Sequence, residues 1–495
     1  MRSFRLPQAV ATLAIFGLAL ALRLEQHHAA LLYPDGYQYL LMARGISEHF
    51  EPTTLLGPGG EVFVPSADAA AKPLFPLLVA IVHAFGASWL SAAEIVTAAA
   101  GAAAITAVFL LASRLGGSWL AGAAAALVLL ASPTLAFWSG FSGPDPVAQA
   151  LGLGAALAFL DHRPRLGGVL LALAVATRPE LILVALVAGA ACAWEPGRRA
   201  AATRGAVAFA LTLTLVFAAL RTPIEQPDVE FLWLVPLLLV IGAAAVIAPP
   251  TRFLVGVGAV VLLGVLIVGS VTAPGLAEMW GNDWPLLGLG LAGLALTVFD
   301  QHRRRYALAV LLAAVLLGTV YWVKNPALER YFAIVLPLAA VLVGVGVAAL
   351  SRSRRSLVVP ACAVVTAVVA VGFVRTSTAN HDQDVFSRTA QKLSPVLSRS
   401  DPLVTAAPDA YGFWLPAQPV RTMRPGVRGM ILLDPAQRSY ASDLTASGRI
   451  VARFENDLAF SRPDGEIDVG AAILVAGSVT ATRPRASDAL HEPRG

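Results

Sequence analysis

Two acidic residues in short polar turns have the residue type and the setting for chemistry. Asp35 lies in residues 33–37 (YPDGY), between an apolar segment and an amphipathic one, and Asp145 lies in residues 142–146 (SGPDP), before another apolar segment. Either carboxylate could cap a helix N-terminus, with Pro146 at the first helical position in the second case. The alternative for Asp35 is a general base that takes the proton of an attacking hydroxyl. The alternative for Asp145 is a ligand of a divalent metal ion or of a hydroxyl group.

A second set of residues could bind an anion at the ends of apolar segments. Arg178 and Glu180 flank Pro179 between two short apolar segments, where charge is costly unless it is paired or hydrated. They could pair with each other and close the junction, or Arg178 could bind a lipid phosphate, with Glu180 as a further carboxylate of the same site. The position of each of four other residues can be explained by snorkelling or by anchoring at the membrane interface. Taken together, these four residues could join Arg178 around one phosphate. These residues are Lys72, Lys324, Arg330 and Tyr331.

The composition indicates that membrane-spanning helices position these residues. The chain is 57% hydrophobic and 14% charged, with a mean hydropathy of +0.71, whereas soluble domains carry about 25% charged residues. These values exclude an ordinary soluble enzyme. No basic run is interleaved with aromatic residues, so nucleic acid is not an expected partner. Cys192 and Cys362 each lie in an apolar segment and indicate neither a disulfide nor a metal site.

The apolar segments predict an all-α polytopic bundle of about 13 transmembrane helices, because a segment in lipid must satisfy its own backbone hydrogen bonds. They lie near residues 7–22, 90–113, 119–137, 145–160, 166–177, 181–194, 205–220, 231–248, 253–272, 284–299, 306–322, 331–350 and 357–374. With the N-terminus inside, the inner loops receive fifteen basic residues against three acidic ones, in agreement with the positive-inside rule. An odd number of crossings then places the C-terminus outside. We expect the first segment to be retained as a helix rather than cleaved as a signal peptide.

The chain divides into a membrane domain and a C-terminal domain. Residues 1–374 form the expected transmembrane catalytic domain, whose first external loop, residues 23–72, contains an amphipathic surface helix at 37–49. A short interfacial helix follows at 74–85. Residues 375–482 predict a small external α/β domain, with a helix at 384–397 and strands near 402–406, 430–433, 449–454 and 471–476. Residues 483–495 are polar and are expected to be disordered.

The order of these motifs resembles a known family. The acid of residue 35 is followed by YQYLLMARGI at 37–46, KPLFPLLVAIVHAFG at 72–86 and SAAEIVTAAAGAAAITAVFLLASRLGG at 91–117. Pro-Asp then opens the fourth apolar segment, Thr-Arg-Pro-Glu at 177–180 joins two short segments, and Arg-Tyr at 330–331 opens a late one. This arrangement resembles the GT-C superfamily of integral-membrane glycosyltransferases, which includes the protein O-mannosyltransferases and the aminoarabinose and galacturonosyl transferases of bacteria.

The resemblance implies a polyprenyl-phosphate sugar as donor, used on the external side of the membrane by an enzyme with N-in, C-out topology. Asp35 then corresponds to the acidic base of the first external loop, and Asp145 to the acid of the second external loop, which is linked to metal or acceptor binding. Arg178 and Arg330 correspond to basic positions near the donor phosphate. Gly36 stands where many relatives have a second acid. This difference argues against a tightly bound metal and leaves a divalent ion on Asp35 and Asp145 as an alternative.

We therefore expect a glycosyltransferase of the bacterial plasma membrane, with its active site and its C-terminal domain outside the cytoplasm. It would transfer a hexose or a pentose to a cell-envelope glycan, lipid or protein, with inversion because a single base assists a direct displacement. A transporter or lipid flippase, and a non-catalytic assembly subunit of the same fold, are the alternative interpretations. Most charges lie at the ends of apolar segments, and no internal repeat is evident, which favours the enzyme over the transporter.

Overall fold

The structure, a computed structural model, describes part of the chain as two compact units. The described residues are 6–25, 34–139, 143–182, 199–219, 274–298, 310, 314, 317, 332–353, 364–370, 385–433, 444–455, 460–461, 467–468 and 471–481. The first unit comprises residues 1–27 and 70–380, and the second comprises residues 28–69 and 381–495. Most of the first external loop, which was expected to belong to the membrane domain, thus packs with the C-terminal residues.

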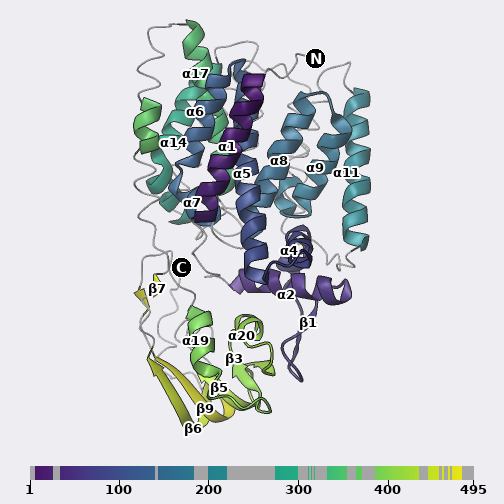
Figure 1. The fold of residues 1–495 in the computed structure, drawn as a ribbon, viewed down its shortest axis with the longest axis vertical. Coiled ribbons are helices and arrows are strands. Elements are labelled where there is room, and N and C mark those ends of the chain that lie inside the picture. Colours follow the sequence, from purple (N-terminus) through teal and green to yellow (C-terminus); the bar gives the residue numbers. More distant parts are fainter. Residues whose placement is uncertain are drawn as a thin grey trace, which may run out of the picture. The chain divides into compact units, whose positions relative to one another are not determined.

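The first unit is a bundle of helices. Its elements are α1 (Leu6–Glu25), α4 (Leu74–Ala84), α5 (Trp89–Gly116), α6 (Trp119–Leu130), α7 (Pro133–Ser139), α8 (Asp145–Leu160), α9 (Pro164–Val175), η1 (Pro179–Leu181), α11 (Arg199–Ala219), α14 (Pro274–Val298), η4 (Ala333–Val335) and α17 (Leu336–Ser353). The longer helices run alongside one another (Figure 1). α5 lies at the centre of the bundle, where it packs against α1, α6, α8 and α17.

The local sequence explains where several of these helices begin and end. Ser88 and Ser118 cap α5 and α6, because each hydroxyl accepts a hydrogen bond from a backbone N–H of the first turn. Gly117 ends α5 in the left-handed conformation, at φ 68°. The single segment expected at 119–137 is wrong, since two helices, α6 and α7, occupy it. Pro133 separates them, because it cannot donate the hydrogen bond that a continuous helix requires.

Glycines allow the helices of the first unit to approach closely. A Cβ on Gly122 would lie 2.0 Å from Ser113 Oγ, and one on Gly344 would lie 2.3 Å from the carbonyl oxygen of Ala121. Gly293 meets α17 in the same way, at 2.2 Å from a backbone oxygen. Contacts of small residues are typical of helix pairs in membranes, where van der Waals packing drives association. Gly122, Gly293 and Gly344 therefore serve helix packing.

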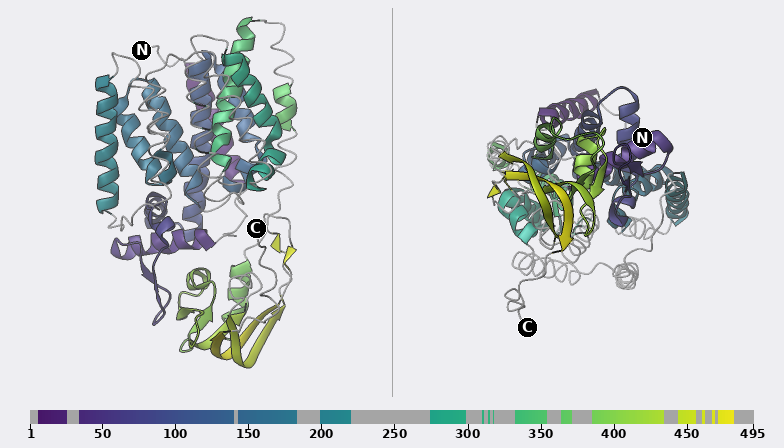
Figure 2. Two further views of the ribbon diagram at one scale, coloured as in Figure 1. Left: turned by 180° about the vertical axis from the view of Figure 1, so that it is seen from behind. Right: turned by 90° about the horizontal axis from the view of Figure 1, so that it is seen from below.

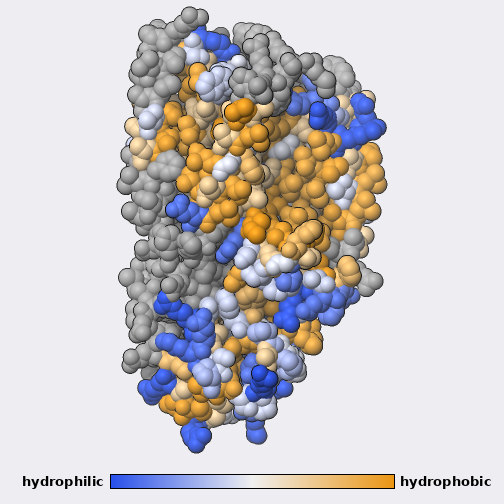
Figure 3. Space-filling model, in the orientation of Figure 1, coloured by the Kyte–Doolittle hydropathy of each residue, from blue (hydrophilic) through white to orange (hydrophobic). Residues whose placement is uncertain are grey.

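Two described helical stretches, Trp89–Gly116 and Ala333–Arg352, are long and apolar enough to cross a membrane, and five shorter apolar helices accompany them. Hydrophobic residues make up much of the described surface of the helical unit in Figure 3. Leu13 and Leu215 are among the exposed apolar residues of this unit, with 70% and 68% of their surface exposed. The segments expected at 231–248 and 253–272 lie outside the described residues. The number of crossings therefore stays a prediction.

The second unit contains a mixed β-sheet. Its elements are α2 (Pro34–His49), β1 (Thr54–Leu55), β2 (Val62–Phe63), α3 (Ala67–Ala70), α19 (Val385–Leu393), β3 (Leu403–Thr405), α20 (Pro408–Trp414), β4 (Val420–Thr422), β5 (Arg428–Leu433), β6 (Leu444–Glu455), β7 (Phe460–Ser461), β8 (Ile467–Asp468) and β9 (Ala471–Ala481). The five-stranded sheet has the order β4-β3-β5-β9-β6. β3 pairs in parallel with β4 and β5, whereas β9 pairs antiparallel with β5 and β6. α19 and α20 lie on one face of this sheet (Figure 2).

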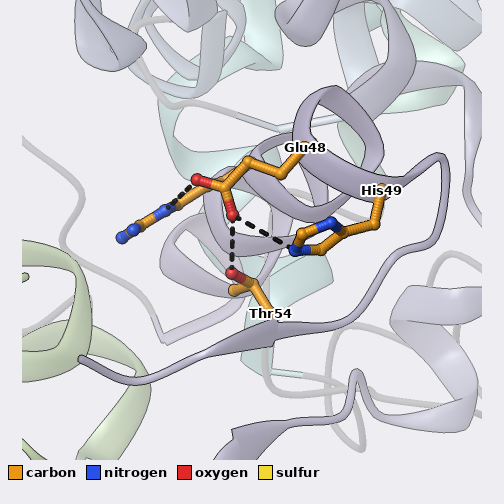
Figure 4. Close-up of polar contacts among 4 residues, drawn as sticks. Glu48, His49 and Thr54 are labelled. Atoms are coloured by element: carbon orange, nitrogen blue, oxygen red, sulfur yellow. Dashed lines mark hydrogen bonds and ion pairs between the residues drawn. The ribbon is translucent and has the colours of Figure 1, made fainter. Parts of the chain in front are cut away.

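The C-terminal end of α2 is fixed by contacts with the turn that follows it (Figure 4). Glu48 accepts hydrogen bonds from Arg44 Nε at 2.9 Å and from Thr54 Oγ1 at 3.4 Å, and His49 Nε2 lies 3.7 Å from the same carboxylate. A Cβ on Gly45 would lie 2.2 Å from a carbonyl oxygen of the turn. Glycine therefore lets the chain fold back against the helix.

Candidate active site

The start of α8 and the end of α9 bring an acid and an arginine of the expected site together. α8 and α9 are packed neighbours joined by a short turn. Asp145 is the first residue of α8, and Arg178 follows the last turn of α9. Arg178 Nε donates a hydrogen bond to Asp145 Oδ1 at 2.6 Å, and Arg178 Nη2 contacts the same oxygen. The structure thus joins two residues that lie 33 positions apart in the sequence.

This ion pair is nearly withdrawn from solvent on the arginine side. The side chain of Arg178 is 2% exposed, and that of Asp145 is 19% exposed. A buried guanidinium needs a charged, hydrogen-bonded partner, because the loss of its hydration is otherwise uncompensated. Both contacts fall on Oδ1, and in the described part of the chain Asp145 Oδ2 makes no hydrogen bond. Asp145 therefore anchors Arg178 with one oxygen and retains a second acceptor.

A one-turn 3₁₀ helix, η1, holds the backbone of Arg178 in place. The N–H of Arg178 donates to the carbonyl of Ala174 at 2.8 Å, and its carbonyl accepts from the N–H of Leu181 at 3.0 Å. Glu180 is 3% exposed, and its Oε1 lies 4.0 Å from Arg178 Nη1. The ion pair expected between these two residues is thus the longer contact of Arg178. Asp145, which comes from another helix, is its close partner.

Lys72 is buried at the same end of the bundle. Its side chain is 2% exposed, and it directly precedes Pro73 at the start of α4. The N–H of Leu74 donates to the carbonyl of Ala176 at 3.3 Å, which ties this segment to the end of α9. Lys72 lies two residues before Leu74, the donor of this hydrogen bond, and Arg178 lies two residues after Ala176, its acceptor. Two buried cations and two acids are gathered near this junction.

The remaining expected site residues stand differently. Asp35 belongs to the first turn of α2 in the second unit, and its side chain is not among those that the structure describes. Lys324, Arg330 and Tyr331 lie outside the described residues. Their proposed roles therefore rest on the sequence alone.

The described residues do not form a metal centre around Asp145. No group of three or more His, Cys, Asp and Glu side chains in the described ranges could hold a metal ion. The Arg178 guanidinium occupies Asp145 Oδ1, so a divalent cation would meet Oδ2 alone beside a fixed positive charge. The geometry of Asp145 suits an anchor for an arginine better than a metal ligand.

Two buried charges of the first unit were not singled out from the sequence. Asp283 is 1% exposed, lies at a kink in α14, and accepts a hydrogen bond from the N–H of Thr134 at 3.3 Å, at the start of α7. Arg23 of α1 is also 1% exposed, and it meets Gly101 of α5 together with Ser139, the last residue of α7. An acid at the start of α7 and a cation near its end both interact favourably with the helix dipole. The signal for Asp283 was an acid two residues before a proline inside an apolar stretch.

Comparison with known proteins finds likeness in structure. No family model matches the sequence, and no curated protein matches it either. ArnT from Cupriavidus metallidurans in the apo state superposes with a TM-score of 0.58 at 15% identity, over 94% of this chain and 98% of that chain. ArnT bound to undecaprenyl phosphate gives 0.57 at 13% identity, over 93% and 97%.

An archaeal oligosaccharyltransferase has a similar fold. The oligosaccharyltransferase of Archaeoglobus fulgidus, crystallised in complex with Zn and sulfate, superposes with a TM-score of 0.57 at 14% identity, over 92% of this chain and 73% of that chain. At these identities the likeness concerns the fold. The chain has the fold of the GT-C superfamily of glycosyltransferases, as its sequence motifs predicted.

Proposed function

We propose that the chain is a membrane glycosyltransferase that takes its sugar from a polyprenyl-phosphate donor. The observation that carries this proposal is the buried Arg178 guanidinium, which Asp145 holds at the end of α9 beside the segment of Lys72. Cations held at the end of an apolar bundle suit the phosphate of a lipid, because the guanidinium fork matches phosphate oxygens. The fold agrees with this proposal, since ArnT was crystallised with undecaprenyl phosphate.

In the proposed reaction the acceptor hydroxyl gives its proton to the Asp35 carboxylate, and its oxygen attacks the anomeric carbon of the sugar. The bond between that carbon and the phosphate oxygen breaks, and polyprenyl phosphate leaves with the bonding electrons. Arg178 and Lys72 stabilise the negative charge of the leaving phosphate. A direct displacement with one base inverts the anomeric configuration, so the product has the opposite configuration to the donor.

The other candidate residues have supporting roles in this proposal. Lys324, Arg330 and Tyr331 complete the binding of the donor phosphate. Asp145 fixes the direction of the Arg178 guanidinium, and Glu180 adds a second carboxylate on the acceptor side. We place the reaction at the external face of a plasma membrane, where nucleotide sugars are absent and a membrane-borne donor is required. The acceptor class is a cell-envelope glycan, lipid or protein.

Mass analysis of cell-envelope glycans tests the proposal whichever sugar is transferred. Cells that lack the chain should lose one glycan species, and the wild-type chain should restore it. Asp35→Asn should not restore it, because an amide cannot accept the proton, and Arg178→Gln should restore little. Arg114→Gln is the matched control, since Arg114 donates to Asp161 at 2.6 Å in a pair that is 39% and 34% exposed. Full restoration by Asp35→Asn, or an unchanged glycan profile without the chain, would contradict the proposal.

A further inference from the structure

The helix that carries Asp35 is held by aromatic residues from the C-terminal part of the chain. Tyr37, two positions after Asp35 on α2, is completely buried. Its hydroxyl accepts a hydrogen bond from Trp414 Nε1 of α20 at 2.9 Å. Its ring packs edge-on against Phe386 of α19, with centroids 5.6 Å apart, and is tilted against Phe413 at 5.7 Å. These four rings belong to one compact unit.

The hairpin after α2 is attached to the same part of the chain. The carbonyl of Leu56 accepts from the N–H of Val420 at 2.9 Å, and the N–H of Glu61 donates to the carbonyl of Val420 at 3.0 Å. The Glu61 carboxylate also accepts from the hydroxyl of Thr422 at 2.8 Å. The hairpin therefore extends the edge of the sheet at β4. A segment of the first external loop and the C-terminal residues thus form one packing unit.

We infer that the C-terminal residues position Asp35, and that the hydrogen bond between Tyr37 and Trp414 is the contact that does so. This inference rests on the proposed role of Asp35 as the general base. Asp35 and Tyr37 share the first turn of α2, so a shift of the Tyr37 ring moves the backbone of Asp35. The far end of α2 is fixed by Glu48 and Thr54 (Figure 4). Loss of the contact at Tyr37 therefore releases the N-terminal turn selectively.

The position of a general base decides the rate, because proton transfer requires hydrogen-bond distance to the reacting hydroxyl. A displacement of about 1 Å lowers a rate by up to about a hundredfold. Trp414 does not itself meet the substrate in this inference and is a positioning residue. Its removal should lower kcat and leave the KM for the donor unchanged, because the phosphate-binding residues Arg178 and Lys72 belong to the other unit.

The test uses Trp414→Phe and Tyr37→Phe in the full chain, each of which keeps a ring and removes one partner of the hydrogen bond. Trp119→Phe is the matched control, because Trp119 is 58% exposed at the start of α6. We expect kcat to fall about tenfold or more in both variants and in their combination, with no further loss in the double variant. A nitroxide attached at Asp35→Cys, in a chain without the two native cysteines, should become more mobile in the Trp414→Phe variant and unchanged in the Trp119→Phe variant.

The two readouts separate the inference from the function on which it rests. A normal kcat, or a lower kcat with an unchanged nitroxide spectrum, would overturn the positioning role of Trp414 while the proposed function stands. If the nitroxide becomes more mobile in the Trp414→Phe variant but the wild type transfers no sugar, the contact is supported and the proposed function is rejected. A rise in donor KM with an unchanged kcat would also overturn the inference, since it would assign Trp414 to donor binding.

Discussion

Removal of the Asp145 carboxylate should cost much more stability than removal of the Asp161 carboxylate, although each accepts from an arginine at 2.6 Å. The two pairs differ in burial. Arg178 and Asp145 have side chains that are 2% and 19% exposed, whereas Arg114 and Asp161 are 39% and 34% exposed. Water can replace the lost partner of Arg114 but has little access to Arg178. The comparison therefore isolates the effect of burial.

The magnitudes follow from this difference. Loss of one partner of a buried ion pair costs about 3–5 kcal/mol, because the other charge is left uncompensated. Since Asp145 retains some exposure, we expect the lower end of this range, about 3 kcal/mol, for Asp145→Ala. An exposed pair contributes at most about 1 kcal/mol, and Asp161 also lies at the unfavourable C-terminal end of α8. Asp145→Asn should fall between these values, because its amide oxygen can still accept a hydrogen bond.

Unfolding of the purified protein in mild detergent, followed by tryptophan fluorescence during a titration with SDS, measures the difference. The expected order of destabilisation is Asp145→Ala, then Asp145→Asn, then Asp161→Ala. Equal effects of the two alanine variants would show that Arg178 gains no more from its partner than an exposed arginine does, which contradicts this prediction. A stabilising effect of Asp145→Ala would refute it as well.

Three further predictions concern other parts of the chain. Asp283→Ala should lower the free energy of unfolding by about 1 kcal/mol, because α7 loses the acceptor at its N-terminus. Asp283→Asn should cost less. Equal stability of the wild type and the alanine variant would contradict this role. Burial raises the pKa of the Asp409 carboxyl from 3.8 to about 6, so the folded state favours the neutral acid. The second unit should therefore lose up to about 3 kcal/mol of stability as the pH rises from about 4 to about 6. Hydrogen exchange of α20 measures this loss. Asp409→Asn should remove the pH dependence of the exchange, and a pH dependence that persists in this variant would exclude Asp409 as its cause. Gly122→Ala should destabilise the bundle by about 1–3 kcal/mol, whereas Gly288→Ala, with no atom within 4 Å of its Cβ, should be neutral in the same SDS titration; similar effects of both would exclude close packing as the cause.

Local signals were sufficient to predict most of the described elements. The segment expected at 145–160 coincides with α8, and the helix expected at 74–85 coincides with α4 to within one residue. The strands near 402–406, 430–433, 449–454 and 471–476 overlap β3, β5, β6 and β9. Hydrophobic periodicity, prolines and caps act over a few residues, so a sequence displays them directly. Pro133 is also a local signal, because a proline indicates a helix boundary. It marks the break between α6 and α7 that the prediction of a single segment missed.

Long-range relations were not predictable in this way. Arg178 pairs closely with Asp145 rather than with Glu180, its near neighbour in sequence, because the packing of α8 against α9 brings Asp145 to it. The attachment of the first external loop to β4 likewise depends on hydrogen bonds between residues more than 350 positions apart. The burial of Asp283 depends on where the start of α7 lies. These features arise from tertiary packing, on which local periodicity carries no information.

Binding of undecaprenyl phosphate to the purified chain shows whether Arg178 receives the phosphate of a lipid donor. Native mass spectrometry of the wild type, Arg178→Gln, Arg178→Lys and Arg114→Gln would give the relative affinities. We expect equal binding by the wild type and Arg114→Gln. Arg178→Gln should lose at least about tenfold in affinity, which corresponds to one charge-assisted hydrogen bond. Arg178→Lys should retain part of the affinity through its charge. Wild-type affinity in a folded Arg178→Gln variant would contradict the claim.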